Sequence, residues 1–458
     1  MLFKSITKVF HRTIYIAIVV QVTLGVGACQ TEYAPANKSE TDGFVTVRGG
    51  RFYLNDKPYF FMGTNLWYGA YLGMAGEAGD RDRLSRELDI LRQHGITNLR
   101  ILAASESTQL LMSLRPATQT APGEYNEKLL EGLDFLLAEM AKRNMKAVLF
   151  LNNFWQWSGG MSQYVVWATG EKIIDPDVSG DWPGFIEQSA SFYRLPEAQT
   201  QYRRYVESII TRKNTVSGVV YRDDPAIMSW QLANEPRPGI HGKQPDDYRP
   251  FVEWIEETAQ YINELAPKQL VSSGSEGTWG SVDDKALFIE SHDSEYIDYL
   301  TCHLWVKNWS WFDATKPEQT YSQALENAKR YIKEHIDIAA SLNKPIVMEE
   351  FGVERDDADY RLSSSTIYRD KFYREYFQLI MDSASKGGPI MGVNFWSWGG
   401  LGRAQHEDLI WREGDPFVGD PPQEPQGLNS VFADDKSTLA ILKEYAAVFE
   451  SLKQRSDE

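Results

Sequence analysis

Eight short apolar runs alternate with longer segments of helical periodicity along this sequence, and this alternation predicts an α/β fold, a (β/α)8 TIM barrel. The runs are nearly continuous in apolar residues, as expected of parallel strands covered on both faces. No glycine-rich nucleotide fingerprint follows the first run, which disfavours the alternative of a doubly wound open sheet. With 458 residues, 42% of them hydrophobic, the chain has enough apolar surface to fold as one large domain.

The predicted domain spans residues 43–458, and its elements follow one another without a linker, a repeat or a low-complexity tract. A short N-terminal β-hairpin comes first, because Val45–Val47 and Phe52–Leu54 flank the turn residues Gly49 and Gly50. The predicted strands are Tyr59–Gly63, Ile96–Leu102, Ala147–Asn152, Ile227–Asn234, Leu270–Gly274, Tyr299–Trp305, Ile346–Phe351 and Gly392–Trp398. The helical patterns between them include Arg83–His94, Leu129–Arg143, Ala198–Arg212, Phe251–Leu265, Ala324–Leu342 and Tyr368–Ser385.

The amino terminus has the features of an export signal. A basic start is followed by the apolar run Ile14–Val26, which is too short to span a bilayer comfortably. The run ends in Val26-Gly27-Ala28-Cys29, which resembles the lipobox of bacterial lipoproteins. We therefore expect a signal peptide over 1–28, a lipidated Cys29, a tether over 29–42, and an exported chain anchored at a bacterial outer membrane or cell surface. Ordinary secretion and a retained anchor are the alternatives.

Composition narrows the class of partner. The 47 basic residues face 64 acidic ones, a formal charge of -17, which disfavours nucleic acid and anionic membranes as partners and leaves only the lipid anchor for membrane contact. The 14 Trp and 23 Tyr suit a neutral, flat-faced ligand such as a sugar. Two cysteines make no disulfide framework. The seven His form no metal-binding motif, so we expect no metal or cofactor. We also expect a monomer.

Polar residues end six of the eight predicted strands, at the edge where barrels of this kind place their active sites. These residues are Arg100, Asn152-Asn153, Asn234-Glu235, His303 with Trp305, Glu349-Glu350, and Trp396. Two carboxylates on opposite sides of one mouth are what glycosidic cleavage requires, and Glu235 with Glu350 supply them. Adjacent strand residues face opposite sides, so only one of Glu349 and Glu350 is expected to point inward, and we favour Glu350.

The other strand-end residues fit supporting roles in such a site. Arg100 is expected to hold Glu350 ionised by charge pairing, and Asn234 to bind the sugar 2-hydroxyl. His303 and Trp305 are expected to orient the carboxylates with N–H donors. Trp396 is expected to offer a flat platform beneath a sugar ring.

Two longer stretches now identify a family resemblance. The segment Asn152-Asn153-Phe154 followed by Gly159–Ala168 resembles the third-strand loop of endo-β-1,4-mannanases of glycoside hydrolase family 5, more than that of the family's cellulases. The segment Tyr221–Arg237, with Ala233-Asn234-Glu235-Pro236 near its end, resembles the one that carries the family's acid/base glutamate. The resemblance extends over nearly all of residues 43–453.

The resemblance implies a role for each matching position. Glu235 matches the proton donor and Glu350 the nucleophile, while Arg100, Asn234, His303 and Trp396 match supporting positions. Trp305 stands where the family commonly has a tyrosine that donates to the nucleophile, and Asn153 stands where many members have a histidine. Trp67 and the neighbouring Tyr68 are both candidates for a distal sugar platform.

The implied activity is retaining, endo-acting hydrolysis of β-1,4-mannosidic bonds in mannan, glucomannan or galactomannan. It requires burial and the nearby Glu350 charge to raise the pKa of Glu235, and Arg100 to keep that of Glu350 low. A groove lined by tryptophans, Trp67 among them, would suit an internal run of a polymer. The alternatives are a β-1,4-glucanase of the same family and a surface glycan-binding lipoprotein without catalysis.

Overall fold

The structure, a computed structural model, describes residues 43–455. The expected signal peptide, Cys29 and the tether up to residue 42 lie outside the described residues and stay predictions. Of the helices within residues 43–455, none is both long enough and apolar enough to cross a membrane.

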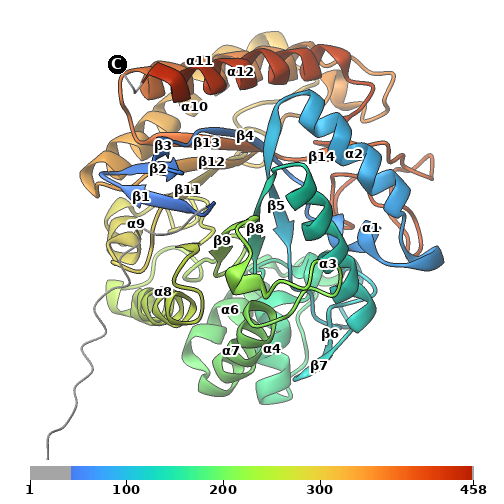
Figure 1. The fold of residues 1–458 in the computed structure, drawn as a ribbon. Coiled ribbons are helices and arrows are strands. Elements are labelled where there is room, and N and C mark those ends of the chain that lie inside the picture. The colour runs from blue at the N-terminus through green and yellow to red at the C-terminus, as the bar shows by residue number, and fades with distance from the viewer. Residues whose placement is uncertain (1–42, 456–458) are drawn as a thin grey trace, which may run out of the picture. The chain divides into compact units, whose positions relative to one another are not determined.

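The predicted barrel is confirmed within this part of the chain. Its strands are β4 (Phe61–Asn65), β5 (Ile96–Leu102), β8 (Lys146–Phe150), β9 (Ile227–Gln231), β10 (Leu270–Ser272), β11 (Leu300–Leu304), β12 (Ile346–Phe351) and β13 (Ile390–Phe395). They pair in parallel in the order β10-β9-β8-β5-β4-β13-β12-β11, so that the sheet curls into a nearly closed barrel (Figure 1). Each strand overlaps one of the predicted runs, because continuous apolar runs of this length suit strands buried on both faces.

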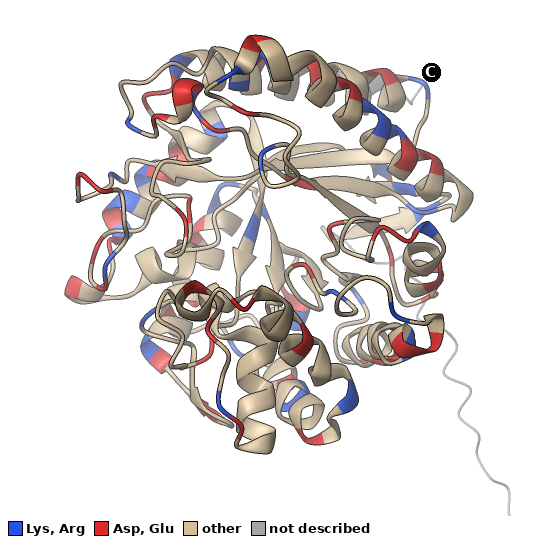
Figure 2. Cartoon of the chain, turned by 180° about the vertical axis from the view of Figure 1, so that it is seen from behind, with Lys and Arg blue, Asp and Glu red and all other residues tan. Residues whose placement is uncertain are grey.

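Helices surround the sheet, and those predicted from periodicity are present. They are α2 (Arg81–Gln93), α3 (Glu127–Lys142), α7 (Pro196–Ile210), α8 (Pro245–Leu265), α10 (Pro317–Ser341) and α11 (Ile367–Ser385). Local chemistry sets their starts: the Asp80 side chain accepts from the Arg83 N–H at the start of α2, and α7 and α10 begin at a proline. Charged residues lie mainly on these helices and on the loops, whereas the strands are largely uncharged (Figure 2).

The remaining elements were not predicted individually, apart from the hairpin. The hairpin β1 (Val45–Arg48) and β2 (Arg51–Leu54) pairs further with β3 (Lys57–Pro58). The others are α1 (Gly69–Gly73), β6 (Gln119–Ala121), β7 (Glu124–Tyr125), α4 (Gly160–Thr169), α5 (Pro176–Ser179), α6 (Trp182–Ser191), α9 (Lys285–His292), β14 (Trp398–Gly400), β15 (Val431–Phe432) and α12 (Lys436–Arg455). Several of them extend the loops at the carboxyl ends of the barrel strands, where the site lies.

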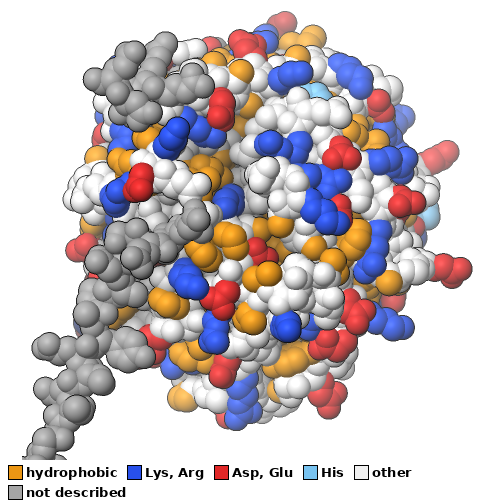
Figure 3. Space-filling view, in the orientation of Figure 1, with side chains coloured by type: hydrophobic (Ala, Val, Ile, Leu, Met, Phe, Trp, Pro, Cys, Tyr) orange, Lys and Arg blue, Asp and Glu red, His pale blue; other side chains and the backbone are white. Residues whose placement is uncertain are grey.

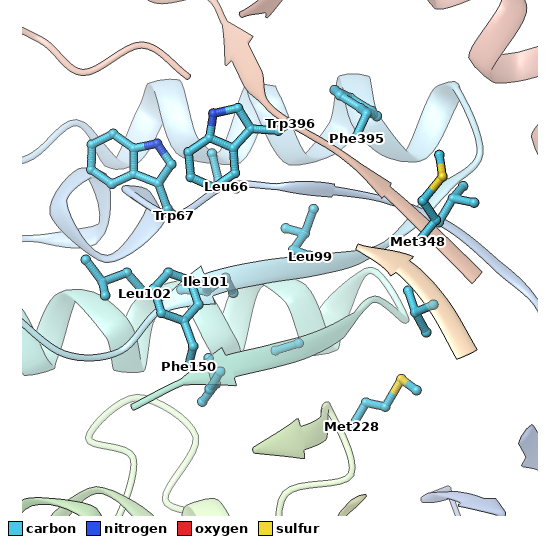
Figure 4. Packing of buried hydrophobic residues seen from close by; sticks show 14 of the residues in the cluster. Leu66, Trp67, Leu99, Ile101, Leu102, Phe150, Met228, Met348, Phe395 and Trp396 are labelled. Atoms are coloured by element: carbon cyan, nitrogen blue, oxygen red, sulfur yellow. The ribbon is translucent and has the colours of Figure 1, made fainter. Parts of the chain in front are cut away.

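Apolar side chains fill the space between strands and helices, and Figure 4 shows part of this packing around β4, β5, β8 and β13. The inside of the barrel is more polar. Asn394 donates to the Asn98 side chain over 3.1 Å, and the Tyr299 hydroxyl donates to Ser229 over 2.9 Å. This polar layer leads up to the charged residues at the strand ends. On the face shown in Figure 3, acidic and basic side chains are interspersed.

Candidate active site

A cavity of about 540 Å³ opens at the carboxyl ends of the strands. Side chains that follow β8 to β13 line it: Trp155, Gln156, Trp157, Trp182, Ile186, Asn234, Glu235, Arg237, Glu276, Trp279, Trp305, Asn308, Trp309, Glu350, Trp396, Pro421, Gln423 and Glu424. Both predicted carboxylates therefore face the same space.

Arg100 on β5 holds the carboxylate at the end of β12. Its guanidinium donates to Glu350, and it also donates to Asn234 Oδ1 over 2.9 Å and to Gln231 Oε1 over 2.8 Å. The guanidinium carbon lies 4.5 Å from the centre of the Phe150 ring, and the whole side chain is buried. With its donors directed at fixed acceptors, Arg100 keeps Glu350 in one orientation.

Glu235 directly follows the predicted run Ile227–Asn234, of which the first five residues form β9. Its backbone is left-handed, with φ of 50°. A non-glycine residue held in this region stores strain of about 1–3 kcal/mol, a cost typical of functional positions. Its carboxylate accepts from His303 Nδ1 and from Trp155 Nε1, each over 2.5 Å, and from Trp305 Nε1 over 3.3 Å. Trp305 thus donates to Glu235, one of the two carboxylates that its indole was expected to orient.

The expectation that only one of Glu349 and Glu350 points inward is wrong, because both carboxylates lie against Arg100 and His303. The Glu349 carboxylate accepts from Gln231 Nε2 over 2.6 Å and lies 3.3 Å from Arg100 Nε and 3.9 Å from His303 Nε2. The pairing of β11 with β12 explains this: Cys302 pairs with Met348 and His303 with Glu350, so Glu349 is an extra residue on β12. Such a bulge breaks the strict alternation from which the sequence prediction was made.

The resting charge distribution also differs from the expected one. His303 has its pKa raised to about 10; burial lowers it, but the charge of Glu350 and hydrogen bonds to Glu235 and Glu349 outweigh burial. Burial raises the pKa of Glu235, yet the hydrogen bond and charge of His303 make the net shift downward. Burial raises the pKa of Glu350 to about 8, although His303 and Arg100 act in the opposite direction. His303 therefore keeps its proton in the resting site and donates from Nδ1 to Glu235.

The two carboxylates are close together. One oxygen each from Glu235 and Glu350, and one nitrogen of His303, all lie within 4.8 Å of one another. This spacing fits retaining glycosidases, whose carboxyl groups are about 5–5.5 Å apart, rather than inverting ones, which need room for a water. The same three side chains have the spacing of metal ligands. However, protonated His303 donates from Nδ1, and Arg100 occupies a Glu350 oxygen, so these atoms are engaged in hydrogen bonds.

Asn234, Asn153 and Trp396 occupy distinct places around this pair. Asn234 lines the cavity and donates to Asn153 Oδ1 over 3.1 Å. Asn153 is fully buried and accepts from the Trp155 N–H over 3.1 Å, so it positions its neighbours and does not face the cavity. Trp396 lines the cavity, and its indole nitrogen has no hydrogen-bond partner among the described residues.

Trp67 does not form the expected platform. Its side chain is 0% exposed, packs edge-on against Phe417 and Trp157, and donates from Nε1 to the Gly419 carbonyl over 2.6 Å. Figure 4 shows Trp67 beside Trp396, but only Trp396 reaches the cavity. Tyr68 is equally buried and donates to the Trp398 carbonyl over 2.8 Å. The loop after β13 covers the rings of Trp67 and Tyr68. Its sequence has no periodicity and did not predict this burial.

Several cavity residues were missed from the sequence. Arg237 pairs with Glu276, with an Nη2–Oε2 distance of 2.5 Å, and its guanidinium carbon lies 4.7 Å from the centre of the Trp155 ring. Burial raises the pKa of Glu276 to about 7, with the Arg237 charge opposing it. Arg237 lies two residues after Glu235 in the sequence, and this position could have predicted that it lines the cavity. Glu424 lies in a loop without periodicity and gave none; burial raises its pKa well above the usual range.

Comparisons with known proteins agree with this geometry. The family model described as GH family 5 beta-mannosidase-like matches residues 42–454. A putative mannan endo-1,4-beta-mannosidase 4 from Arabidopsis thaliana is 29% identical over 90% of this chain and 93% of its own. Mannan endo-1,4-beta-mannosidase 1 from Oryza sativa subsp. japonica is 31% identical over 77% of this chain and 78% of its own.

Solved structures show the same fold. A glycoside hydrolase family 5 mannosidase from Rhizomucor miehei superposes with a TM-score of 0.83 and 37% identity, covering 91% of this chain and 99% of that one. An endo-beta-1,4-mannanase from Thermotoga petrophila gives a TM-score of 0.63 at 24% identity, covering 86% and 78%, and so shows likeness of fold alone. Because the family model matches almost the whole described chain, this protein is a glycoside hydrolase that belongs to the β-mannosidase-like group of glycoside hydrolase family 5.

Proposed function

We propose that this enzyme hydrolyses β-1,4-mannosidic bonds with retention, in mannan, glucomannan or galactomannan. The observation that carries the proposal is the pair Glu235 and Glu350, with carboxylate oxygens within 4.8 Å of each other, each held by its own cation. The mannan endo-1,4-beta-mannosidase relatives and the family 5 mannosidase structure support mannose as the sugar.

In the proposed first step, a Glu350 oxygen attacks the anomeric carbon and forms a mannosyl ester, while the leaving oxygen takes a proton from Glu235. In the second step Glu235 accepts a proton from water, the water oxygen attacks the same carbon, and Glu350 leaves as a carboxylate. Asn234, held by Arg100 and Asn153, faces the cavity where it can bind the 2-hydroxyl of the sugar. Trp396 supplies the platform beneath the ring.

His303 connects the two carboxylates in this scheme. Its proton is held mainly by the negative charge of Glu350. Esterification of Glu350 removes that charge, which lowers the pKa of His303 and passes its proton along the 2.5 Å hydrogen bond to Glu235. The proton that Glu235 gives to the leaving oxygen therefore comes from His303, so the resting pKa of Glu235 need not be raised. Glu235 is left as a carboxylate that accepts the proton of water in the second step, and this proton returns to His303 when the Glu350 charge is restored.

We propose that the enzyme attacks bonds within the polymer chain. One observation favours a second candidate, the release of sugar units from chain ends. The loop after β13 covers Trp67 and contributes Pro421, Gln423 and Glu424 to the cavity wall. A wall at this place would shorten the run of sugar that the cleft accepts on the Glu350 side. Similarity to the Rhizomucor miehei mannosidase favours the same candidate. Endo attack lowers the viscosity of a mannan solution early, whereas attack at chain ends releases mannose or mannobiose with little change in viscosity.

The test is product release from mannan, glucomannan and cellulose by the wild type, Glu235→Ala and Glu350→Ala. Oligomannosides from the wild type, with at least a thousandfold loss in both variants, are the expected result. Cello-oligosaccharides would support the glucanase, and binding of mannan without any release of reducing ends would support the glycan-binding lipoprotein. The structural variant Asn153→Ala should lose less activity than either glutamate variant, because Asn153 acts through Asn234.

We also propose that the chain is exported and lipid-anchored through Cys29. The proposal is based on the Val26-Gly27-Ala28-Cys29 segment and its apolar run. An anchored hydrolase at an outer surface suits a polymer that is too large to enter the cell. Metabolic labelling with a fatty acid should mark the wild type and not Cys29→Ser; equal labelling of both would contradict the anchor.

A further inference from the structure

A second hollow of about 550 Å³ lies beside the catalytic cavity and shares one wall with it. Its lining comes from the segments after β10 and β11 and from one face of α10: Thr278, Trp279, Asp283, Lys285, Trp311, Asn327, Arg330, Tyr331, Lys333, Glu334 and Asp337. Trp279 lines both the cavity and the hollow, so the two spaces adjoin at this ring.

Three tryptophans form the boundary, which we call the tryptophan ridge: Trp279, Trp309 and Trp311. Trp279 stacks on Trp309 with ring centres 4.6 Å apart and an interplanar angle of 25°, and Trp311 meets Trp309 edge-on at 4.9 Å. Trp309 faces the cavity, whereas Trp311 faces the hollow, and both Trp279 and Trp311 remain partly exposed. Tyr331 supports the ridge from α10, with its ring centre 4.9 Å from that of Trp309.

The hollow suits a neutral ligand. Its charged lining consists of three acids, Asp283, Glu334 and Asp337, and three bases, Lys285, Arg330 and Lys333, which balance in formal charge. Such a rim offers hydrogen-bond donors and acceptors to hydroxyl groups without attracting an anionic or a cationic polymer. Aromatic rings beside polar side chains are the combination that binds sugars, since rings stack on the apolar faces of the pyranose.

The hollow adjoins the leaving-group side of the site. Glu235, which we propose to protonate the leaving oxygen, is bonded to Trp155, on whose ring Arg237 lies. Arg237 in turn pairs with Glu276, and the Tyr331 hydroxyl donates to the Glu276 carbonyl over 2.6 Å. This chain of contacts leads from Glu235 to the tryptophan ridge.

We infer that the hollow is an accessory subsite that binds the distal mannosyl units of the leaving-group end of the substrate chain, across the tryptophan ridge. The inference rests on the proposed function for the direction of the chain. On this inference Trp311 and Arg330 bind only long substrates, because short substrates end within the catalytic cavity.

Chain-length dependence tests the inference. Wild type, Trp311→Ala and Arg330→Ala are compared on mannotriose and mannohexaose, with Lys329→Ala as the matched control: Lys329 is adjacent on α10 but pairs with Glu375 at 2.8 Å and does not line the hollow. We expect the gain in kcat/KM from mannotriose to mannohexaose to shrink by about five- to tenfold in Trp311→Ala. A smaller loss is expected in Arg330→Ala and none in Lys329→Ala. Arg330 is exposed, so that variant is expected to fold even if Trp311→Ala does not.

A binding experiment separates this inference from the proposed function. Calorimetry measures mannohexaose affinity of Glu350→Ala alone and combined with Trp311→Ala or Arg330→Ala. A five- to tenfold weaker affinity in the Trp311→Ala combination supports the subsite, even if the wild type cleaves no mannoside and the proposed function fails. Equal affinities, equal losses on both chain lengths, or no mannohexaose binding at all would overturn it.

Discussion

Replacing Glu349 by glutamine is expected to move the whole pH profile of kcat/KM to lower pH. A hydrogen bond to Glu349 raises the pKa of His303, and the Glu349 charge raises that of Glu350. Removing the Glu349 carboxylate lowers both pKa values, so Glu350 ionises at lower pH and His303 loses its proton at lower pH. The acidic and basic limbs therefore shift in the same direction. Glutamine keeps the shape of the side chain and an oxygen acceptor for Gln231.

The size of the shift follows from the distance. Glu349 Oε2 lies 3.9 Å from His303 Nε2, and two unit charges at that separation interact by about 4 kcal/mol at an effective dielectric constant of about 20. At about 1.36 kcal/mol per pH unit, this sets an upper limit of about three units. Arg100, 3.3 Å from Glu349, loses a partner in the same variant, and its positive charge acts in the same downward direction on both pKa values. We expect the basic limb to move down by about one unit or more.

The assay is initial-rate hydrolysis of mannohexaose between pH 4 and 11, with kcat and KM separated. Asp134→Asn is the matched control, because it also removes a buried carboxylate paired with one arginine, Arg212, at 2.8 Å, but lies on α3 in the helical layer. It should lower stability without moving either limb. An active Glu349→Gln enzyme whose limbs stay in place, or move to higher pH, would refute the assigned role of Glu349.

Arg100→Met is expected to lower kcat by at least a hundredfold, because it leaves Glu350 buried without the guanidinium that holds it; a loss under tenfold would contradict this. Trp305→Phe removes the longest of three donors to Glu235, so kcat/KM should fall tenfold or less, and a thousandfold loss would be inconsistent with the 3.3 Å contact. Burial raises the pKa of Glu106 to about 8, above its value of about 4.5 in the unfolded chain. The contribution of Glu106 to the free energy of unfolding is therefore present below about pH 4.5 and is lost as the pH rises through about 8. Glu106→Gln should remove this loss, and a melting-temperature difference from wild type that stays constant with pH would contradict it.

The barrel was predictable because its strands are continuous apolar runs, and the helices between them follow a regular period. The same reasoning located the mouth of the site, since strand ends of a parallel barrel meet at one edge. Arg100, Asn234, Glu235, His303 and Glu350 were found in this way, and the structure brings them into contact.

What the sequence did not predict depends on shifts of one residue or on irregular loops. A bulge at Glu349 lets both glutamates face inward, and no composition or period marks it. Trp305 reaches Glu235 across the barrel mouth, a direction that spacing along β11 does not specify. The burial of Trp67 depends on Phe417 and Gly419, more than 300 residues away in a loop without period.

In the proposed reaction Glu350, and not its neighbour Glu349, attacks the sugar. Incubation with 2-deoxy-2-fluoro-β-mannosyl fluoride, followed by proteolysis and mass spectrometry, tests it directly: the attacking carboxylate displaces fluoride and stays esterified to the anomeric carbon. We predict one fluoromannosyl group per chain, on Glu350, with none in Glu350→Ala. A label on Glu349 or Glu235, or turnover of a natural mannoside with inversion and no label, would contradict it.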